Sequence, residues 1–387
     1  MGKQYISTAT ASDAHKLDIL ALSVTDRYTI TVSSDGYANF WDNKKYELQE
    51  PNDVVVKEFV NKMGVHHVVT YENILSGSHV KVVLIAFASF DGSISFKYFI
   101  NDELSSLKDA EIGLGANSAN WSPCFYKDPE SKQDYFIVTQ ANGSALVYYL
   151  NIESNKDSED IVIKLEKFGD LNNANSTLFP NSVAVSPGAD KKIAVGYTNG
   201  DVLLYDLTTL KPIYTFRSTD LQVSSKSTTA SSIPRVLAFS PGGTLLAVAR
   251  DNQSAGSITL YDVKYGENVG SLTTPSHSSK TTIGGFAHDG WIMGLSFDES
   301  GEILASCAFD NCVRIWNIET REREATINIS TSDLESSNGN ELDNSIASGV
   351  QFIKKGIRAG ANGDSNEGLC VISFDRAVRW YREAGGI

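Results

Sequence analysis

The sequence predicts an all-β, seven-bladed propeller that residues 1–387 form as a single domain. Three observations support this prediction. A tight turn followed by a closing aromatic residue recurs along the chain, short apolar strands precede these turns, and a spare strand stands ahead of the first repeat. The apolar residues show no helical periodicity, and no tract rich in proline or glycine divides the chain.

The first repeat shows the pattern most completely. Residues 19–24 and 28–33 are predicted strands, Asp35-Gly36 is a tight turn, and Tyr37–Trp41 is a third strand. Asp and Gly suit such a turn because both tolerate the left-handed backbone that it needs. Later turns are predicted at Asp91-Gly92, Asn142-Gly143, Asn199-Gly200, Gly256, Asp310-Asn311 and Asp375-Arg376. The residues that close the third strands recur 50 to 65 positions apart, at Trp41, Tyr98, Tyr148, Tyr205, Tyr261, Trp316 and Tyr381.

Apolar strands precede these turns, most clearly at residues 236–239 and 245–249, which flank Ser240-Pro241-Gly242-Gly243. A unit of three or four such strands cannot bury both of its faces alone. Stacking the units radially buries those faces and leaves only short, protected edges.

The two ends of the chain predict how the ring closes. The sequence ends on a third strand, Ala377–Tyr381, so the last blade lacks an outer strand. Residues 5–9 form a spare strand ahead of the first repeat. We therefore expect residues 5–9 to pair with the last blade.

Composition restricts the classes of function. The formal charge is −14, and Lys354-Lys355 is an isolated basic pair, so direct binding to a nucleic-acid backbone is disfavoured. Four cysteines lack C-x-x-C spacing, so neither a disulfide framework nor a metal site is expected, and no cofactor is implied. No signal peptide or membrane-spanning run stands out, which predicts a cytosolic or nuclear protein.

No arrangement of residues typical of catalysis is present. A nucleophile elbow, a phosphate-binding glycine loop and a metal-spaced set of His, Asp and Glu are all missing from the sequence. His66-His67 is the one histidine cluster, and neighbours on a regular strand point to opposite faces, so the two should not chelate one ion. The sequence therefore predicts a binding protein and not an enzyme.

These repeats resemble the WD40 family. His15, Ser33, Asp35 and Trp41 occupy the positions of the hydrogen-bonded tetrad that the family uses structurally, in which Ser and His supply partners for the buried indole and carboxylate. His288, Asp310 and Trp316 match the same pattern, with Ala308 where the serine is expected. Other repeats replace Trp by Tyr and lack the histidine.

A narrower resemblance is to the WD-repeat subunits of the yeast superkiller complex. It rests on residues 236–326, on the ending 376–386, on Asp35-Gly36-Tyr37 with residues 41–44, and on His66-His67. The resemblance is weak over residues 101–170 and 330–348. It implies an adaptor that joins a tetratricopeptide scaffold and a DExH RNA helicase and supports 3′-to-5′ mRNA decay by the cytoplasmic exosome. It also implies a second, nuclear role in meiotic double-strand break formation, with a topoisomerase-like break-forming protein. Both partners would present a Gln-Arg-x-x-hydrophobic peptide to the propeller's top face.

Aromatic residues next to the turns mark a candidate docking surface on that face. In a propeller, the residue before the turn Asp and those before the first strand of a blade lie at the top rim. Clustered exposed aromatics with a few charges are typical of binding hot spots. The candidate partner-binding residues are Trp121, Trp291, Phe309, Phe90, Phe374, Arg235, Arg250 and Asp18, the last as a partner for an incoming arginine.

Each of these aromatics could instead fill a blade junction, and three rival functions remain open. A generic WD scaffold, such as a substrate receptor or a chromatin subunit, predicts other co-purifying proteins. An RNA-binding propeller predicts salt-sensitive RNA binding by the isolated chain. An enzyme requires a polar pocket with perturbed carboxylates. The sequence leaves open the copy number in a complex, whether the meiotic role applies, which top-face residues dominate, and the order of the Ser330–Ser348 loop.

Overall fold

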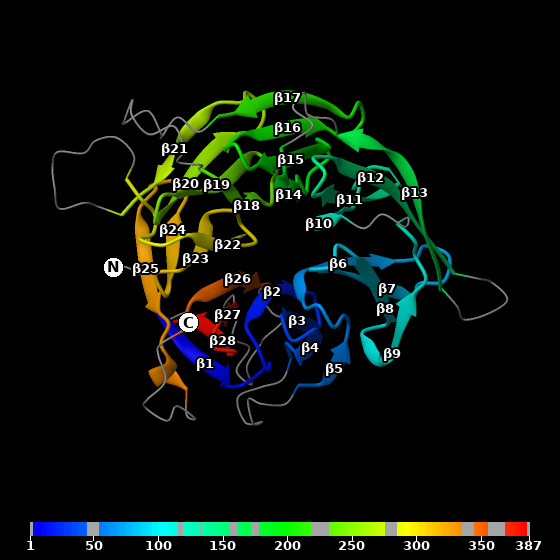
Figure 1. Cartoon of the computed structure of the whole chain (residues 1–387), viewed down its shortest axis with the longest axis horizontal. Helices are drawn as coiled ribbons and strands as arrows, with labels where there is room; N and C mark the ends of the chain where they lie inside the picture. The colour runs from blue at the N-terminus through cyan, green and yellow to red at the C-terminus, as the bar shows by residue number, and fades with distance from the viewer. Residues whose placement is uncertain are drawn as a thin grey trace.

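The computed structural model describes residues 3–44, 54–114, 119–131, 133–154, 161–171, 178–217, 232–274, 285–334, 344–354 and 368–384. Within these ranges it contains seven four-stranded antiparallel sheets, arranged as a ring (Figure 1). The expected seven-bladed propeller is confirmed. Part of the Ser330–Ser348 loop, residues 335–343, lies outside the described residues.

Each blade runs from an inner strand to an outer one. Blade 1 contains β2 (Ile19–Val24), β3 (Tyr28–Ser33), β4 (Tyr37–Asp42) and β5 (Val56–Phe59). Blade 2 contains β6 (Val65–Ile74), β7 (Lys81–Ser89), β8 (Ile94–Ile100) and β9 (Glu103–Ala110). Blade 3 contains β10 (Asn120–Tyr126), β11 (Asp134–Gln140), β12 (Ala145–Ser154) and β13 (Ile161–Leu171). Blade 4 contains β14 (Pro180–Val185), β15 (Lys192–Tyr197), β16 (Val202–Asp206) and β17 (Lys211–Phe216).

The remaining blades follow the same order. Blade 5 contains β18 (Pro234–Phe239), β19 (Leu245–Asn252), β20 (Ala255–Asp262) and β21 (Asn268–Leu272). Blade 6 contains β22 (Ile292–Phe297), β23 (Ile303–Ala308), β24 (Cys312–Asn317) and β25 (Arg323–Asn328), and a short 3₁₀ turn, η1 (Thr331–Asp333), follows it. Blade 7 contains β26 (Ala347–Ile353), β27 (Gly368–Ser373), β28 (Val378–Glu383) and, as its outer strand, β1 (Tyr5–Ala11).

Closure of the ring by the N-terminal strand is also confirmed. The strand β1 pairs antiparallel with β28, from Tyr5 opposite Glu383 to Ala11 opposite Val378. In Figure 1 the blue start of the chain lies beside its red end. The last blade therefore joins both ends of the sequence, and losing either end removes a strand from the same sheet.

Apolar contacts between blades form the core. Seven clusters of buried side chains each lie between two neighbouring blades, and the cluster between blades 7 and 1 packs Trp380 edge-on against Trp41 at 5.5 Å. This is the burial that isolated blades could not achieve.

The turn between the second and third strands requires a left-handed residue. Gly36 has φ +83°, and an added Cβ there would overlap the carbonyl of Asn61. In blade 5 this turn lies at Gln253, with φ +54°, whereas Gly256 lies within β20 opposite Asp251. The expectation that Gly256 marks the turn is therefore wrong. Its missing side chain instead leaves room for Ile292 of the next blade.

Candidate functional site

The top rim is the edge that carries the turn from the second to the third strand of each blade and the connection into the next inner strand. In blade 1, a buried hydrogen-bond network fixes this edge. His15 Nδ1 lies 3.4 Å from Asp35 Oδ1, and His15 Nε2 lies 2.9 Å from Thr31 Oγ1. Trp41 donates its indole N–H to the same Thr31 oxygen at 3.0 Å. Burial opposes ionisation of Asp35, but the hydrogen bonds from His15 and from the backbone of Lys16 and Tyr37 lower its pKa to about 2.

Ser33 does not fill the tetrad position expected for it. Its hydroxyl donates to the carbonyl of Leu17 at 3.0 Å and accepts the backbone N–H of Asp35 at 3.1 Å. Thr31, two residues earlier on β3, faces the same side of the strand and meets the indole. Ser33 therefore shapes the turn, while Thr31 links His15 to Trp41.

Blade 6 repeats this network in full. His288 Nδ1 lies 2.9 Å from Asp310 Oδ1, and Ser306 Oγ lies 2.7 Å from His288 Nε2. The indole N–H of Trp316 also donates to Ser306, at 2.8 Å. The interpretation that Ala308 replaces the serine is wrong, because the serine lies two residues earlier at Ser306. Blade 6 lacks no member of the tetrad.

Other blades use different polar contacts in place of the histidine. In blade 7, Arg379 pairs with Asp375, its Nη2 lying 2.6 Å from Oδ2, and it also reaches the backbone of Ser330. In blade 4 the hydroxyls of Tyr197 and Tyr205 lie 2.9 Å apart. Replacement of the closing Trp by Tyr is therefore compensated locally.

One group of top-rim residues, the Trp291 cluster, comprises Trp291, Phe309, Phe374 and Arg235. The ring centroids of Trp291 and Phe309 lie 5.6 Å apart, and those of Phe309 and Phe374 lie 5.8 Å apart. Trp291 is 40% exposed although its indole N–H is held by the Gln253 carbonyl at 2.7 Å. Arg235 lies over the Trp291 ring at 5.0 Å and pairs through two bonds with Asp251. The cluster is thus a rigid, partly exposed aromatic surface.

A second group, the His66 cluster, comprises His66, His67, Phe90, Trp121 and Phe179. Trp121 stacks on His66 at 4.2 Å, while Phe90 lies 4.9 Å from His66 and Phe179 lies 5.5 Å from Trp121. Phe179 was not among the predicted residues. It directly precedes inner strand β14, as Trp291 precedes β22, so the same positional rule could have found it.

The two histidines do not point to opposite faces. Their Nδ1 atoms lie 2.6 Å apart, because the ladder register shifts between Val65 and His67 and breaks the strand's alternation. Burial lowers the pKa of His66 to about 4 and that of His67 to about 3. Both rings are therefore neutral near pH 7. Within the described residues, no group of three or more His, Cys, Asp or Glu side chains is arranged to hold a metal ion.

A central cavity of about 750 Å³ connects the two groups. Inner strands of all seven blades line it, and its upper wall includes His66, Phe90 and Trp121 on one side and Arg235 and Met293 on the other. The cavity wall thus carries aromatic side chains of the His66 cluster and Arg235 of the Trp291 cluster.

The structure places two of the charged candidates differently. Arg250 is 1% exposed, and its guanidinium donates to Tyr261 Oη and to the carbonyls of Gly200 and Phe216. It joins blades 4 and 5 and cannot reach a partner, so the docking role expected of it is wrong. Asp18 is half-buried just before β2. Burial raises the pKa of its carboxyl, which the nearby charge of Arg376 partly offsets.

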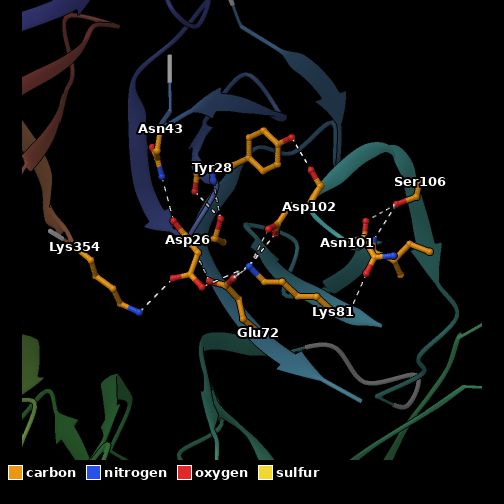
Figure 2. A network of polar contacts seen from close by, with 11 residues as sticks. Asp26, Tyr28, Asn43, Glu72, Lys81, Asn101, Asp102, Ser106 and Lys354 are labelled. Carbon is orange, nitrogen blue, oxygen red and sulfur yellow. Dashed lines mark hydrogen bonds and ion pairs between the residues drawn. The ribbon is translucent and has the colours of Figure 1, made fainter. Parts of the chain in front are cut away.

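The opposite, bottom rim carries the Lys81 network of Asp26, Glu72, Lys81, Asp102 and Lys354 (Figure 2). Lys81 Nζ lies 2.9 Å from both Glu72 Oε2 and Asp102 Oδ1, and 3.5 Å from Asp26 Oδ2. Lys354 reaches Asp26 from blade 7 at 3.4 Å. Burial by itself would lower the pKa of Lys81, but the Glu72 and Asp102 carboxylates have the larger effect and raise this pKa. Ion pairs between its two lysines and three carboxylates join blades 1, 2 and 7. Among the described residues, no helix is long and apolar enough to span a bilayer.

Comparison with known proteins gives three similarities and one family match. Residues 279–317 match the family described as WD domain, G-beta repeat. The chain is 33% identical to the antiviral protein SKI8 of Saccharomyces cerevisiae, over 100% of both sequences. It is 26% identical to the meiotic recombination protein rec14 of Schizosaccharomyces pombe, over 70% of this chain and 74% of that protein. A similarity to WD repeat-containing protein 1 of Gallus gallus, at 32% identity, covers 25% of this chain and 14% of that one.

Proposed function

The chain belongs to the WD40-repeat family of the antiviral protein SKI8, and from this premise we propose that it is a non-catalytic adaptor of a superkiller-like complex. In that complex it joins a tetratricopeptide scaffold and a DExH RNA helicase that support exosome-mediated 3′-to-5′ mRNA decay in the cytoplasm. The single observation that carries the proposal is the end-to-end similarity to SKI8.

The top rim supports a docking role for this adaptor. Trp291, Phe309 and Phe374 form one apolar surface next to Arg235, which lines the cavity, and Phe90 and Trp121 form another at the cavity wall. In the unbound chain, Trp291 is already held by its hydrogen bond to the Gln253 carbonyl and by Arg235. This ordering reduces the conformational entropy that the side chain loses on binding. Asp18 lies at the same rim, where its carboxylate could accept a charge-assisted bond from an arginine of the partner.

A second role in meiotic double-strand break formation is favoured by the similarity to rec14. We propose that the same surface then takes a topoisomerase-like break-forming protein in the nucleus. Use of one surface would make the two partners compete.

The test is co-purification of the tagged chain with the scaffold and helicase at low salt, quantified by mass spectrometry. Trp291→Ala and Trp121→Ala should each weaken binding to the purified scaffold by about 2 kcal/mol or more at a true hot spot. Tyr265→Ala is the matched control, because Tyr265 is 63% exposed in the β20–β21 connection at the bottom rim. Undiminished scaffold binding by both tryptophan variants would place the site elsewhere. Recovery of a different set of subunits would favour a generic WD scaffold.

A further inference from the structure

An exposed apolar strip continues from the His66 cluster outward across the top of blades 1 and 2. We call it the Leu17 strip: Leu17, Phe59, Met63 and Phe90, with exposed fractions of 52%, 51%, 53% and 48%. Exposed apolar residues scattered singly need no explanation, whereas a contiguous patch marks an interaction site.

Contacts with neighbouring residues place the members of the strip at the same rim. Leu17 lies beside the turn of blade 1, because its carbonyl accepts the Ser33 hydroxyl. Gly64, which follows Met63, packs against Ser34 and against the ring of Phe90. Phe59 ends β5 opposite Tyr37 and packs against its ring at 5.4 Å. Leu17, Phe59 and Met63 therefore lie at the top of blade 1 and its connection to blade 2, and Phe90 lies beside them at the cavity wall.

Three exposed lysines border this strip: Lys16, Lys57 and Lys62. None of them forms an ion pair with a described residue, and Lys57 lies over the Tyr37 ring at 4.9 Å. Lys81, Lys97 and Lys192, by contrast, each pair with carboxylates of the chain.

Three acidic groups nearby, Asp13, Asp35 and Asp91, already accept from donors of the chain itself. Asp35 accepts from Lys16 N–H, Tyr37 N–H and His15, and Asp91 accepts from Asn61 and Ser93. Asp13 pairs with Arg376. Among the described residues, Lys16, Lys57 and Lys62 are thus cations at the strip without an ion pair, in a chain whose formal charge is −14.

We propose that the Leu17 strip binds an amphipathic, acidic segment of the docking partner, which extends outward from the peptide held at the channel mouth. Its apolar side chains cover Leu17, Met63 and Phe90, and its carboxylates meet Lys16, Lys57 and Lys62. This inference rests on the proposed docking function and adds the chemistry of the partner's flanking segment. Charge complementarity at such a rim acts mainly on the association rate and its salt dependence, while apolar contacts act mainly on dissociation.

The test measures association and dissociation of the full-length chain with the purified tetratricopeptide scaffold. Lys16→Glu/Lys57→Glu/Lys62→Glu should lower the association rate constant about tenfold at low ionic strength, and high salt should reduce that difference. Leu17→Ser/Met63→Ser should raise the dissociation rate constant about fivefold. Lys44→Glu/Lys164→Glu/Lys211→Glu is the matched control, because it makes the same change in charge at exposed lysines away from the strip.

The outcomes separate the two proposals. If the strip variants bind like the control while Trp291→Ala loses binding, the docking function stands and the role of the strip is overturned. If the wild-type chain does not bind the scaffold, the proposed function fails and this inference fails with it. Unchanged melting temperatures of the variants show that folding is not the cause of any loss.

Discussion

The Trp291 cluster and the Lys81 network occupy opposite rims of the same ring, and both contain residues of blade 7. In the Lys81 network the cation is surrounded by carboxylates from neighbouring strands, and its side chain is 19% exposed. In the Trp291 cluster the indole N–H and the Arg235 guanidinium are paired, but Trp291 is 40% exposed and Phe309 and Phe374 are half-buried. One region therefore satisfies its interactions within the chain, and the other leaves apolar surface that a second molecule could cover.

Deleting residues 1–10 should lower the melting temperature more than any other change, because both regions contain residues of the blade that loses its outer strand. Phe374 of the Trp291 cluster and Lys354 of the Lys81 network belong to blade 7, whose outer strand is β1. The loss of this strand exposes the edge of β28 and the buried contacts of Ala11. We expect the melting temperature to fall by about 10 °C or more. An unchanged melting temperature in calorimetry would contradict closure by β1.

Ser306→Ala should disturb the blade beneath the Trp291 cluster and leave the Lys81 network intact. His288 and Trp316 would each lose a buried partner, which costs about 2 kcal/mol or more of unfolding free energy. Chemical denaturation measures this loss. Ser271→Ala on outer strand β21 is the matched control and should change stability by less than about 0.5 kcal/mol. Equal losses in the two variants would exclude Ser306 as the tetrad serine.

Lys81→Met should separate folding from binding. It leaves Glu72 and Asp102 without their shared cation, and since Lys81 is partly exposed we expect about 1–2 kcal/mol of destabilisation. Scaffold affinity should stay within twofold of wild type, whereas Trp291→Ala should show the reverse pattern. Calorimetry and binding assays on both variants check this. If Lys81→Met is fully folded and still loses affinity for the scaffold, the claim that the bottom rim contributes to stability and the top rim to binding is contradicted.

The His66 cluster, which is the other aromatic group of the top rim, and the Lys81 network should also differ in how their stability depends on pH. His66 and His67 stay neutral in the folded chain down to about pH 4 and 3, whereas unfolded histidines bind protons below about pH 6.5. The unfolded state then binds more protons, so stability falls as pH is lowered from 6.5 towards 4. In the Lys81 network, the pKa of Asp26 lies below its ordinary value of 3.8. The stability that Asp26 contributes is therefore retained until the pH falls below about 3.8. His66→Asn/His67→Asn should flatten the decline between pH 6.5 and 4, measured by urea denaturation.

The exposed histidine His79 supplies the control for this prediction. His79→Asn should leave the decline between pH 6.5 and 4 as it is in the wild-type chain. If the double variant loses stability as steeply as the wild-type chain, the buried histidine pair does not cause the decline.

Sequence spacing predicted the blades and their closure because turns and closing aromatics recur at nearly fixed intervals. It placed the tetrad serine wrongly because residues two apart on a strand share a face, so Thr31 and Ser33 cannot be told apart by alternation alone. The bulge after Val65 brought the two histidines together against that same alternation. Burial of Arg250 depends on the neighbouring blade, whose carbonyls it reaches 34 and 50 positions earlier in the chain. Local patterns carry no signal for such contacts.

Hydrogen–deuterium exchange of the full-length chain, with and without the purified scaffold, tests the central claim most directly. The proposed docking predicts protection of top-rim amides around residues 60–67, 90–93, 289–292, 309–311 and 374–376, with little change around residues 25–28, 75–80 and 101–103 of the bottom rim. Protection confined to the bottom rim would contradict the account.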